Sequence, residues 1–442
     1  MKQKIRIGCG AGFSGDRIEP AVLLAENAAL DYLVLECLAE RTIALAQKRK
    51  MLDANKGYDP LLEKRIIGLL PHLVKNNVKL ITNMGAANPI AAAKKIVEIA
   101  NTLGFNIKVA AVTGDDVLDS VQANAIAMFD TDHNKPLSEY AIVSANAYMG
   151  AEALVEALQT GADIIITGRV ADPSLFLAPM IYEFGWNFNQ YDLLGKATVT
   201  GHLLECAGQV TGGYFADDVY KSVEGLENLG HPFADVSTDG SSVISKLNNT
   251  GGVVNIDTVK EQLLYEVMNP QQYFTPDVVA DFTTVQVKEI GKDQVQINGG
   301  SGKVKPSTYK VSVGYKAFYL GEGEISYAGS TAYERAKLAG NILQQRLHNT
   351  FSDLRIDYIG MQSLHQTDFD YNNKPYEVRV RIAAKANTTE QAALIGEEVE
   401  ALYTNGPAGG GGARKYVNEV IGIVSTLIDR NNIQAQVNVF TS

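Results

Sequence analysis

Cysteine is scarce in this sequence, and the three cysteines are spread over a long chain. An odd number of widely separated cysteines does not form the disulfide framework that stabilises small secreted domains. The segment Met1–Gly8 leads directly into a strand-like pattern, without the apolar stretch and small-residue cleavage site of a secretory signal. A reducing cytoplasm is the simplest setting for such a chain, and we predict a cytoplasmic protein.

Long apolar runs are also missing, and so is an excess of positive charge. No apolar run reaches the roughly 18 consecutive residues that a membrane-spanning helix needs, so we predict no membrane insertion. The formal net charge is −11, and a surface of that sign repels nucleic acid and anionic lipid. A small anionic ligand is still compatible with this charge if local groups hold it against the overall field.

Short apolar runs rich in Ile and Val alternate with helical patterns in the N-terminal part. The runs show little polar alternation, which is typical of strands buried on both faces of a parallel sheet. We therefore predict an α/β fold with a mostly parallel sheet flanked by helices, doubly wound by preference, with a barrel as the alternative. The predicted strands are Ile5–Cys9, Tyr32–Glu36, Val78–Thr82, Ile107–Val112, Ala141–Ser144 and Asp163–Thr167.

Changes in composition divide the chain into three parts. We predict a parallel α/β domain over residues 1–190, an irregular cover segment over 191–275, and an α+β domain over 276–442. The last part contains the glycine-rich loop Gly406–Gly412, which we expect to lead into a helix over Arg414–Leu427.

Helices of the first part begin where strands end, at the carboxyl edge of the predicted sheet. Asn88-Pro89 and Asp172-Pro173 each pair a good N-cap residue with proline at the first helical position. Helix N-termini expose unpaired N–H groups and favour anions. Ligands of both parallel architectures bind at this edge, so we predict the site there whichever architecture holds.

The first strand ends in a loop with four glycines within Gly8–Gly15. Such a loop can bring backbone N–H groups close to a phosphate or carboxylate, although a tight structural turn is the alternative. The spacing departs from the dinucleotide fingerprint, which disfavours a nicotinamide cofactor. The substrate-binding candidates from this loop are Gly10, Gly12, Ser14 and Gly15.

The ends of later strands carry polar side chains. Glu36 ends the second strand, where burial can raise a carboxyl pKa toward acid–base use, and Arg41 would bind a carboxylate. The alternative is a structural Glu–Arg pair. Asn83 follows the third strand among small residues that a ligand can approach closely. Arg169 is not needed for packing at the end of the sixth strand and is expected to bind an anion. Asp172 is expected to cap the next helix in any case, which disfavours a catalytic role for it without removing that candidate.

His202, Glu205 and Cys206 share one helical face by their spacing of three and four residues. With Cys37 they would resemble a metal site, but the motif is not specific, and we predict no metal. The open alternatives for His202 are an acid–base role and a hydrogen-bonded structural role.

The loop Gly406–Gly412 and the cations that follow it have the composition of a phosphate cradle, although not the Walker A sequence. Four adjacent glycines are costly to order, which argues against a mere connector. We expect contact with a ligand or partner through Gly409, Gly410 and Arg414. No cofactor motif stands out, and the CoA moiety of a substrate is the group that these loops would hold.

These motifs resemble the acyclic terpene utilisation A family over nearly the whole chain. Members of that family are associated with bacterial breakdown of citronellol and geraniol through branched acyl-CoA intermediates, so the resemblance implies a pathway rather than catalytic residues. Longer members of the family continue into a small ferredoxin-like domain, and the matching stretches do not include that domain. The matching stretches include GAGFSGDRIEP (Gly10–Pro20), TNMGAANP (Thr82–Pro89), TGRVADPSLFLAP (Thr167–Pro179) and GEGEISYAG (Gly321–Gly329).

Two functions fit these observations. The first is an enzyme that acts on a branched acyl-CoA or related organic acid by hydration or lyase chemistry, with Glu36, His202 or Asp172 as acid or base. In that case Arg41 and Arg169 hold a carboxylate or polarise a carbonyl. The second is a non-catalytic acyl-CoA-binding subunit of a larger complex. We expect a homo-oligomer, either with a separate ferredoxin-like partner protein or without one.

Overall fold

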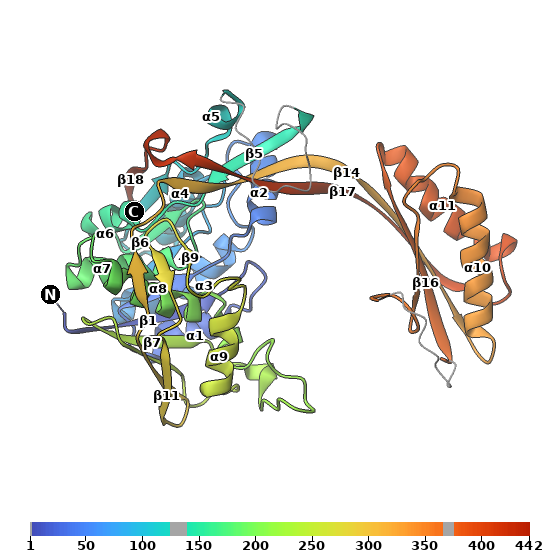
Figure 1. Ribbon diagram of the computed structural model, residues 1–442. Coiled ribbons are helices and arrows are strands. Elements are labelled where there is room, and N and C mark those ends of the chain that lie inside the picture. The colour runs from blue at the N-terminus through green and yellow to red at the C-terminus, as the bar shows by residue number, and fades with distance from the viewer. Residues whose placement is uncertain (1, 124–138, 366–374) are drawn as a thin grey trace. The chain divides into compact units, whose positions relative to one another are not determined.

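The structure is a computed structural model that describes residues 2–123, 139–365 and 375–442 (Figure 1). The chain forms two compact units: the first comprises Met1–Gly314 and Ile423–Ser442, and the second comprises Tyr315–Gly422. The long strands β14 (Thr308–Ala328) and β17 (Gly411–Asp429) each contribute residues to both units. These boundaries differ from the domain boundaries that we predicted from composition, which lie at about residues 190 and 275.

An open sheet of ten strands forms the framework of the first unit within the described ranges. Across the sheet the order is β11 (Gln286–Gly291), β12 (Gln294–Asn298), β8 (Ser242–Lys246), β7 (Pro232–Ser237), β1 (Lys4–Ala11), β2 (Tyr32–Leu35), β3 (Lys79–Thr82), β6 (Ile164–Thr167), β4 (Lys108–Thr113) and β18 (Gln436–Thr441). The neighbours from β1 to β4 pair in parallel, and the outer pairs are antiparallel. The described residues form no closed barrel, so the protein has a mixed α/β fold.

Helices pack on both faces of this sheet, and side chains alternate between the two cores. Leu33 and Leu35 of β2 point into one core, and Tyr32 and Val34 point into the other, as the two-residue period of a strand requires. The first core contains α1 (Glu19–Asn27), α3 (Leu62–Asn76) and α4 (Pro89–Leu103), and the second contains α6 (Glu152–Gln159), α7 (Ser174–Phe184) and α8 (Tyr191–Glu205). No helix in the described part of the chain is long and apolar enough to cross a membrane.

The helix α8 is buried along most of its length. A small sheet of β13 (Ser301–Lys303), β10 (Val279–Asp281) and β9 (Tyr273–Phe274) packs against it. The contact is so close that a Cβ on Gly195 would lie 2.1 Å from the carbonyl oxygen of Ser301. Glycine is therefore required here, and this contact holds the N-terminal part of α8. At the C-terminal end, the ring of Tyr273 from β9 packs against His202.

One predicted strand joins a different sheet, and one predicted helix is wrong. The strand predicted over Ala141–Ser144 exists as β5 (Ile142–Ala147), but it pairs with β14 and not with a strand of the parallel sheet. An apolar run indicates burial without specifying the sheet that the strand joins. The helix predicted over Arg414–Leu427 is instead part of β17, whose β-branched residues favour a strand that pairs with β14. The glycine-rich loop before it therefore does not lead into a helix N-terminus.

The second unit is a sheet with helices on one face. Its strands follow the order β15 (Arg355–Ile359), β16 (Glu377–Ala386), β14 and β17, with α10 (Ala332–Leu347) and α11 (Thr389–Asn405) against them. Alternate residues such as Ile325, Tyr327 and Val380 form a core with these helices.

Candidate functional site

A cavity of about 700 Å³ opens in the first unit where the carboxyl ends of β1, β2 and β6 meet the end of α8. We call it the polar cavity, because carboxyl side chains outnumber the cations that line it. Aromatic side chains of Tyr148 and Tyr273 complete its wall. The carboxyl groups belong to Asp16, Glu36, Glu40, Asp172, Glu205 and Glu266, and the cations belong to Arg169 and Lys310.

Glu36 follows β2 and lines this cavity while its carboxyl is almost fully buried. Its Oε1 accepts hydrogen bonds from the Leu38 N–H and from Nδ2 of Asn83, each at 2.8 Å. Both bonds go to one oxygen, which leaves Oε2 for chemistry in the cavity. Burial and then the charge of Asp172 raise the pKa of Glu36 well above its usual range, although Arg169 opposes this. Burial at this position therefore favours the protonated form of Glu36.

Asn83 binds the Glu36 carboxyl through its side-chain amide. It is fully buried at the end of β3, and its Oδ1 accepts a hydrogen bond of 2.7 Å from the N–H of Cys37. With both ends of the amide engaged, Asn83 fixes the orientation of Glu36.

Arg169 follows β6 and forms an ion pair of 3.1 Å with Asp172. Its guanidinium lies 4.1 Å from the ring centroid of Tyr148 and donates a hydrogen bond to the carbonyl of Leu38. The prediction that Asp172 caps α7 is wrong, because Pro173 is the N-cap and no side chain caps that helix. A buried guanidinium attracts the carboxylate more strongly than a peptide N–H does. Arg169 thus already has an internal anion.

Glu40 contrasts with Glu36, although the two lie only four residues apart. Tyr148 donates a hydrogen bond to Glu40, and the Lys310 ammonium lies 3.5 Å from the same carboxylate. Burial opposes ionisation, but the charge of Arg169 and the Tyr148 hydrogen bond outweigh it and lower the pKa of Glu40 to about 2. The cavity wall therefore holds one carboxyl whose pKa is lowered, Glu40, and another whose pKa is raised, Glu36.

His202 and Glu205 form a pair at the end of α8, with 2.8 Å between Nδ1 and Oε1. His202 is buried against the rings of Tyr273 and Phe282, with centroids 5.3 and 5.5 Å away, and Glu205 is the member of the pair that lines the cavity. Burial raises the pKa of Glu205 to about 7, although His202 opposes the shift. The pair thus presents an acid–base carboxyl backed by an imidazole. The i, i+3 spacing signalled the pair, but the sequence did not show which member faces the cavity.

In the glycine-rich loop after β1, a side chain from the same loop accepts the hydrogen bonds of the backbone N–H groups. Oδ2 of Asp16 accepts hydrogen bonds from the N–H groups of Gly12 at 2.7 Å and Phe13 at 3.3 Å. The hydroxyl of Ser14 donates to Oδ2 of Asp59 at 2.6 Å. These donors are the groups that a bound phosphate would have used, so an external anion would have to displace Asp16.

The other glycines of this loop are placed for packing. A Cβ on Gly10 would lie 2.6 Å from Cδ2 of Leu35, and one on Gly15 would lie 2.4 Å from the ring of Phe13. Gly12 lines the polar cavity, and its Cβ would lie 2.5 Å from the backbone of Cys206. Glycine at this position allows the loop after β1 to contact the end of α8.

The remaining predicted residues are not among those that line the polar cavity within the first unit. Arg41 is exposed on α2 (Glu40–Leu52) and does not line the cavity. Gly409, Gly410 and Arg414 belong to the second unit, where a guanidinium of Arg335 donates 2.8 Å to the carbonyl of Ala408.

Cys37 is held by a buried arginine that the sequence did not single out. Nη1 of Arg65 lies 2.6 Å from the Cys37 sulfur, and Nη2 donates to the carbonyls of Ser14 and Asp16. Among the residues that the structure describes, no group of three or more His, Cys, Asp or Glu side chains is arranged to hold a metal ion.

Tyr148, Glu205 and Lys310 line the polar cavity, but the sequence analysis did not select them as candidate site residues. Tyr148 follows β5 and Lys310 lies on β14, and these segments come together because the two strands pair. Nothing in the local sequence pattern reveals that pairing.

Comparison with known proteins identifies the chain's family. A family model described as "Acyclic terpene utilisation family protein AtuA" matches residues 5–439, a range that includes every residue of the polar cavity named above. No curated protein and no solved structure matches the chain. The chain therefore belongs to the acyclic terpene utilisation family AtuA.

Proposed function

We propose that this member of the acyclic terpene utilisation family is an enzyme that acts on a branched acyl-CoA by acid–base chemistry of the hydration or lyase type. The observation that carries the proposal is that Glu36 and Glu205, two carboxyls with raised pKa values, line one cavity. Carboxyls whose environments set different pKa values can divide the roles of acid and base.

The two carboxyls would take different steps. Glu205, whose pKa is about 7, exchanges its proton readily at neutral pH and would act as the base. In the dehydration direction it accepts the proton next to the thioester carbonyl, a carbon–carbon double bond forms, and the carbon–oxygen bond breaks. Glu36, whose raised pKa favours the protonated form, would donate its proton to the departing hydroxyl, so that water leaves. Hydration is the reverse. His202 is a positioning residue that orients Glu205.

The charge of the polar cavity supports a thioester over a free acid. Its carboxyls outnumber its cations, and Arg169 is already paired with Asp172. A free carboxylate would meet this negative field, whereas a thioester carbonyl or a hydroxyl group is neutral.

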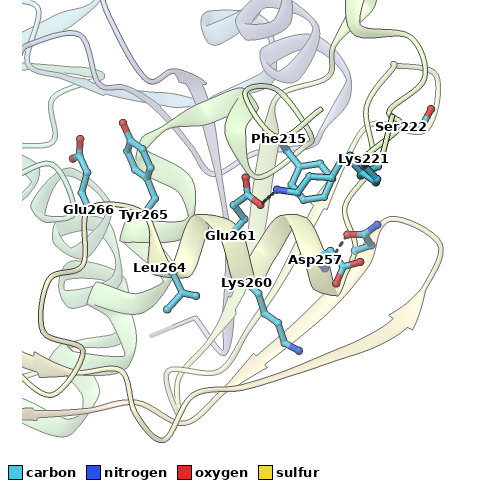
Figure 2. Close-up of a pocket in the computed structure, with 11 residues that line it drawn as sticks. Phe215, Lys221, Ser222, Asp257, Lys260, Glu261, Leu264, Tyr265 and Glu266 are labelled. Atoms are coloured by element: carbon cyan, nitrogen blue, oxygen red, sulfur yellow. Dashed lines mark hydrogen bonds and ion pairs between the residues drawn. The ribbon is translucent and has the colours of Figure 1, made fainter. Parts of the chain in front are cut away.

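An open cleft gives a long substrate a path between the polar cavity and solvent. The cleft lies along α9 (Ile256–Leu264), has a volume of about 810 Å³, and shares Tyr265 and Glu266 with the polar cavity. Figure 2 shows Lys221 directed toward Glu261, with Tyr265 and Glu266 beyond the C-terminal end of the helix. The CoA portion of the substrate would extend through this cleft.

Glu205→Gln tests the proposal, because it keeps the size of the side chain and removes the base. We expect turnover of branched 3-hydroxyacyl-CoA or enoyl-CoA esters to fall at least 100-fold, with ester affinity by calorimetry unchanged, since general-base catalysis contributes about 10²–10⁴-fold. Glu156→Gln, at an exposed position on α6, is the matched control and should retain full turnover.

Full activity of Glu205→Gln would refute the assigned mechanism. Tight binding of CoA esters by the wild type with no turnover of any ester would instead favour the alternative, a non-catalytic acyl-CoA-binding subunit.

A further inference from the structure

A second cavity of the first unit, with a volume of about 790 Å³, adjoins the polar cavity. The two cavities share Tyr148, Asp172, Tyr273 and Lys310. A ligand that fills both would therefore pass between these four side chains. We call the second cavity the apolar cavity, because Ala171, Pro173, Phe274, Pro276, Pro306 and Leu427 contribute to its wall.

The two cavities differ in charge. Among the described residues that line the apolar cavity, the charged side chains are Asp172 and Lys310, and both belong to the shared wall. Away from that wall the lining consists of apolar, proline, hydroxyl and tyrosine side chains. The charges are thus confined to one end of the apolar cavity, which is the arrangement that an amphipathic ligand matches.

Large apolar side chains stand exposed at this cavity. Met268 is 98% exposed, Phe274 is 66% exposed and Leu427 is 41% exposed. Covering such surface with a hydrocarbon is favourable, because it removes apolar area from water. The exposed apolar surface is therefore a reason for a hydrocarbon, rather than a polar group, to occupy the cavity.

The cavity wall around Thr275 and Pro276 is anchored by hydrogen bonds to neighbouring segments of the first unit. Asp277 accepts hydrogen bonds from the Ala151 N–H at 2.8 Å and the Ser174 hydroxyl at 2.5 Å, at the starts of α6 and α7. Nη1 of Arg430 donates 2.7 Å to the carbonyl of Pro276. A wall anchored in this way has a fixed shape, so it can discriminate among chains by length.

We propose that the apolar cavity binds the hydrocarbon end of an acyl chain whose thioester lies in the polar cavity, so that the substrates are medium-length rather than two- or three-carbon acyl esters. This inference rests on the proposed function for the position of the thioester. A volume of about 790 Å³ is of the size that accommodates a drug-sized molecule, and it far exceeds what an acetyl group fills. Tyr273 lines the apolar cavity, and its ring also packs against His202. An acyl chain in this cavity would therefore lie beside the His202–Glu205 pair.

The test is the dependence of affinity on chain length. Dissociation constants are measured by calorimetry for acyl-CoA esters from two to twelve carbons, for CoA alone, and for n-alkanols of the same lengths. We expect affinity to rise with each carbon until the cavity is full, by at most about fourfold per methylene, which corresponds to the 0.8 kcal/mol of a buried CH₂.

Two variants locate the effect. Phe274→Asp adds a charge at an exposed position of the wall, and Thr308→Trp narrows the cavity at a half-buried position. Both should weaken binding of eight- to ten-carbon esters at least 10-fold while binding of acetyl-CoA stays unchanged. Leu52→Asp, at an exposed leucine of α2 outside both cavities, is the matched control and should behave as the wild type.

The outcomes separate this inference from the proposed function. Equal affinity for all lengths in both ligand series, or equal weakening of acetyl-CoA and long-chain esters in the variants, would overturn the apolar cavity as a chain site even if short esters turn over. Alkanol affinity that rises with length and is lost in Phe274→Asp would support the cavity even if no CoA ester binds, in which case the proposed function alone fails.

Discussion

The two units of the molecule bury their sheets in different ways. In the first unit β2, β3 and β6 have 4 residues each, and helices cover both faces, so nearly every side chain is buried. The strands β14 and β17 have 21 and 19 residues and extend through both units. In the second unit, buried residues of β14 that face the helices alternate with partly exposed ones. Short parallel strands end together at one edge, and that edge supplies Glu36, Asn83 and Arg169. The comparison shows why the candidate chemistry gathers in the first unit.

The two units also differ in the groups that bind their buried carboxyl side chains. Asp357 in the second unit is fully buried, and the guanidinium groups of Arg355 and Arg381 each lie 2.9 Å from it. Glu36 in the first unit is held by the neutral amide of Asn83 and a backbone N–H. A carboxyl paired with two cations stabilises a structure in its ionised form, whereas a carboxyl among neutral donors is poised to carry a proton.

The largest expected effect concerns the response of stability to pH in the first unit. Burial raises the pKa of Glu205 from 4.5 to about 7, so between these pH values the unfolded chain releases a proton that the folded chain keeps. Stability from this group is therefore fully present below about pH 4.5 and is lost as pH rises through 7, by an amount on the order of 3 kcal/mol. Urea unfolding from pH 4.5 to 8 should show this slope in the wild type.

Glu205→Gln should make that slope shallower by the share that Glu205 contributes, while Glu156→Gln should leave it unchanged. An identical pH profile in the wild type and in Glu205→Gln would show that Glu205 is not the group that couples folding to protons in this range.

The next effect concerns glycines. A Cβ on Gly168 would lie 2.3 Å from the Asp115 carboxylate, which accepts a hydrogen bond of 2.8 Å from the N–H of Arg169. Gly168→Ala should therefore destabilise the protein by roughly 1–3 kcal/mol, because it overpacks the end of β6. A Cβ on Gly411 in β17 meets no atom within 4 Å, so Gly411→Ala should change stability by less than about 0.5 kcal/mol. Equal unfolding midpoints for the two variants would contradict the contrast between the units.

The smallest effect concerns tyrosine hydroxyls. Tyr148 donates to the Glu40 carboxylate, whereas the buried hydroxyl of Tyr327 has no hydrogen-bond partner in the described part of the chain. Tyr148→Phe should cost about 1 kcal/mol and raise the pKa of Glu40, while Tyr327→Phe should be neutral or slightly stabilising. Thermal unfolding gives the first comparison, and titration of Glu40 by carboxyl carbon NMR gives the second. A larger loss in Tyr327→Phe than in Tyr148→Phe would reverse the assignment.

Local patterns were sufficient where a single strand or helix end decides the outcome. The run that became β2 needed continuous apolar residues because it is buried on both faces, and Glu36 after it could be assigned to the site from position alone. Asn88 accepts a hydrogen bond from the Ala91 N–H at the start of α4, as an N-cap residue before proline suggests.

Long-range pairing set the limits of prediction. Asp172 has the sequence of a helix cap but pairs with Arg169, because the fold buries a guanidinium within its reach. Lys310 forms an ion pair with Glu40, although the two residues are far apart in the sequence. The segment β17 is a strand because it pairs with β14. Local propensity carries no information about such partners.

The pairing of β18 with β4 also has a consequence for the order of events during synthesis. Thr441 pairs with Lys108, and the Ser442 hydroxyl accepts a hydrogen bond of 2.8 Å from the N–H of Ile107, 335 residues earlier. The ribosome must therefore complete the second unit before the first unit can finish its sheet. Until then the free edge of β4 exposes unpaired backbone groups that another strand could capture. On a nascent chain β4 therefore stays open to misassociation until β18, which follows the second unit in the sequence, has been made and pairs with it.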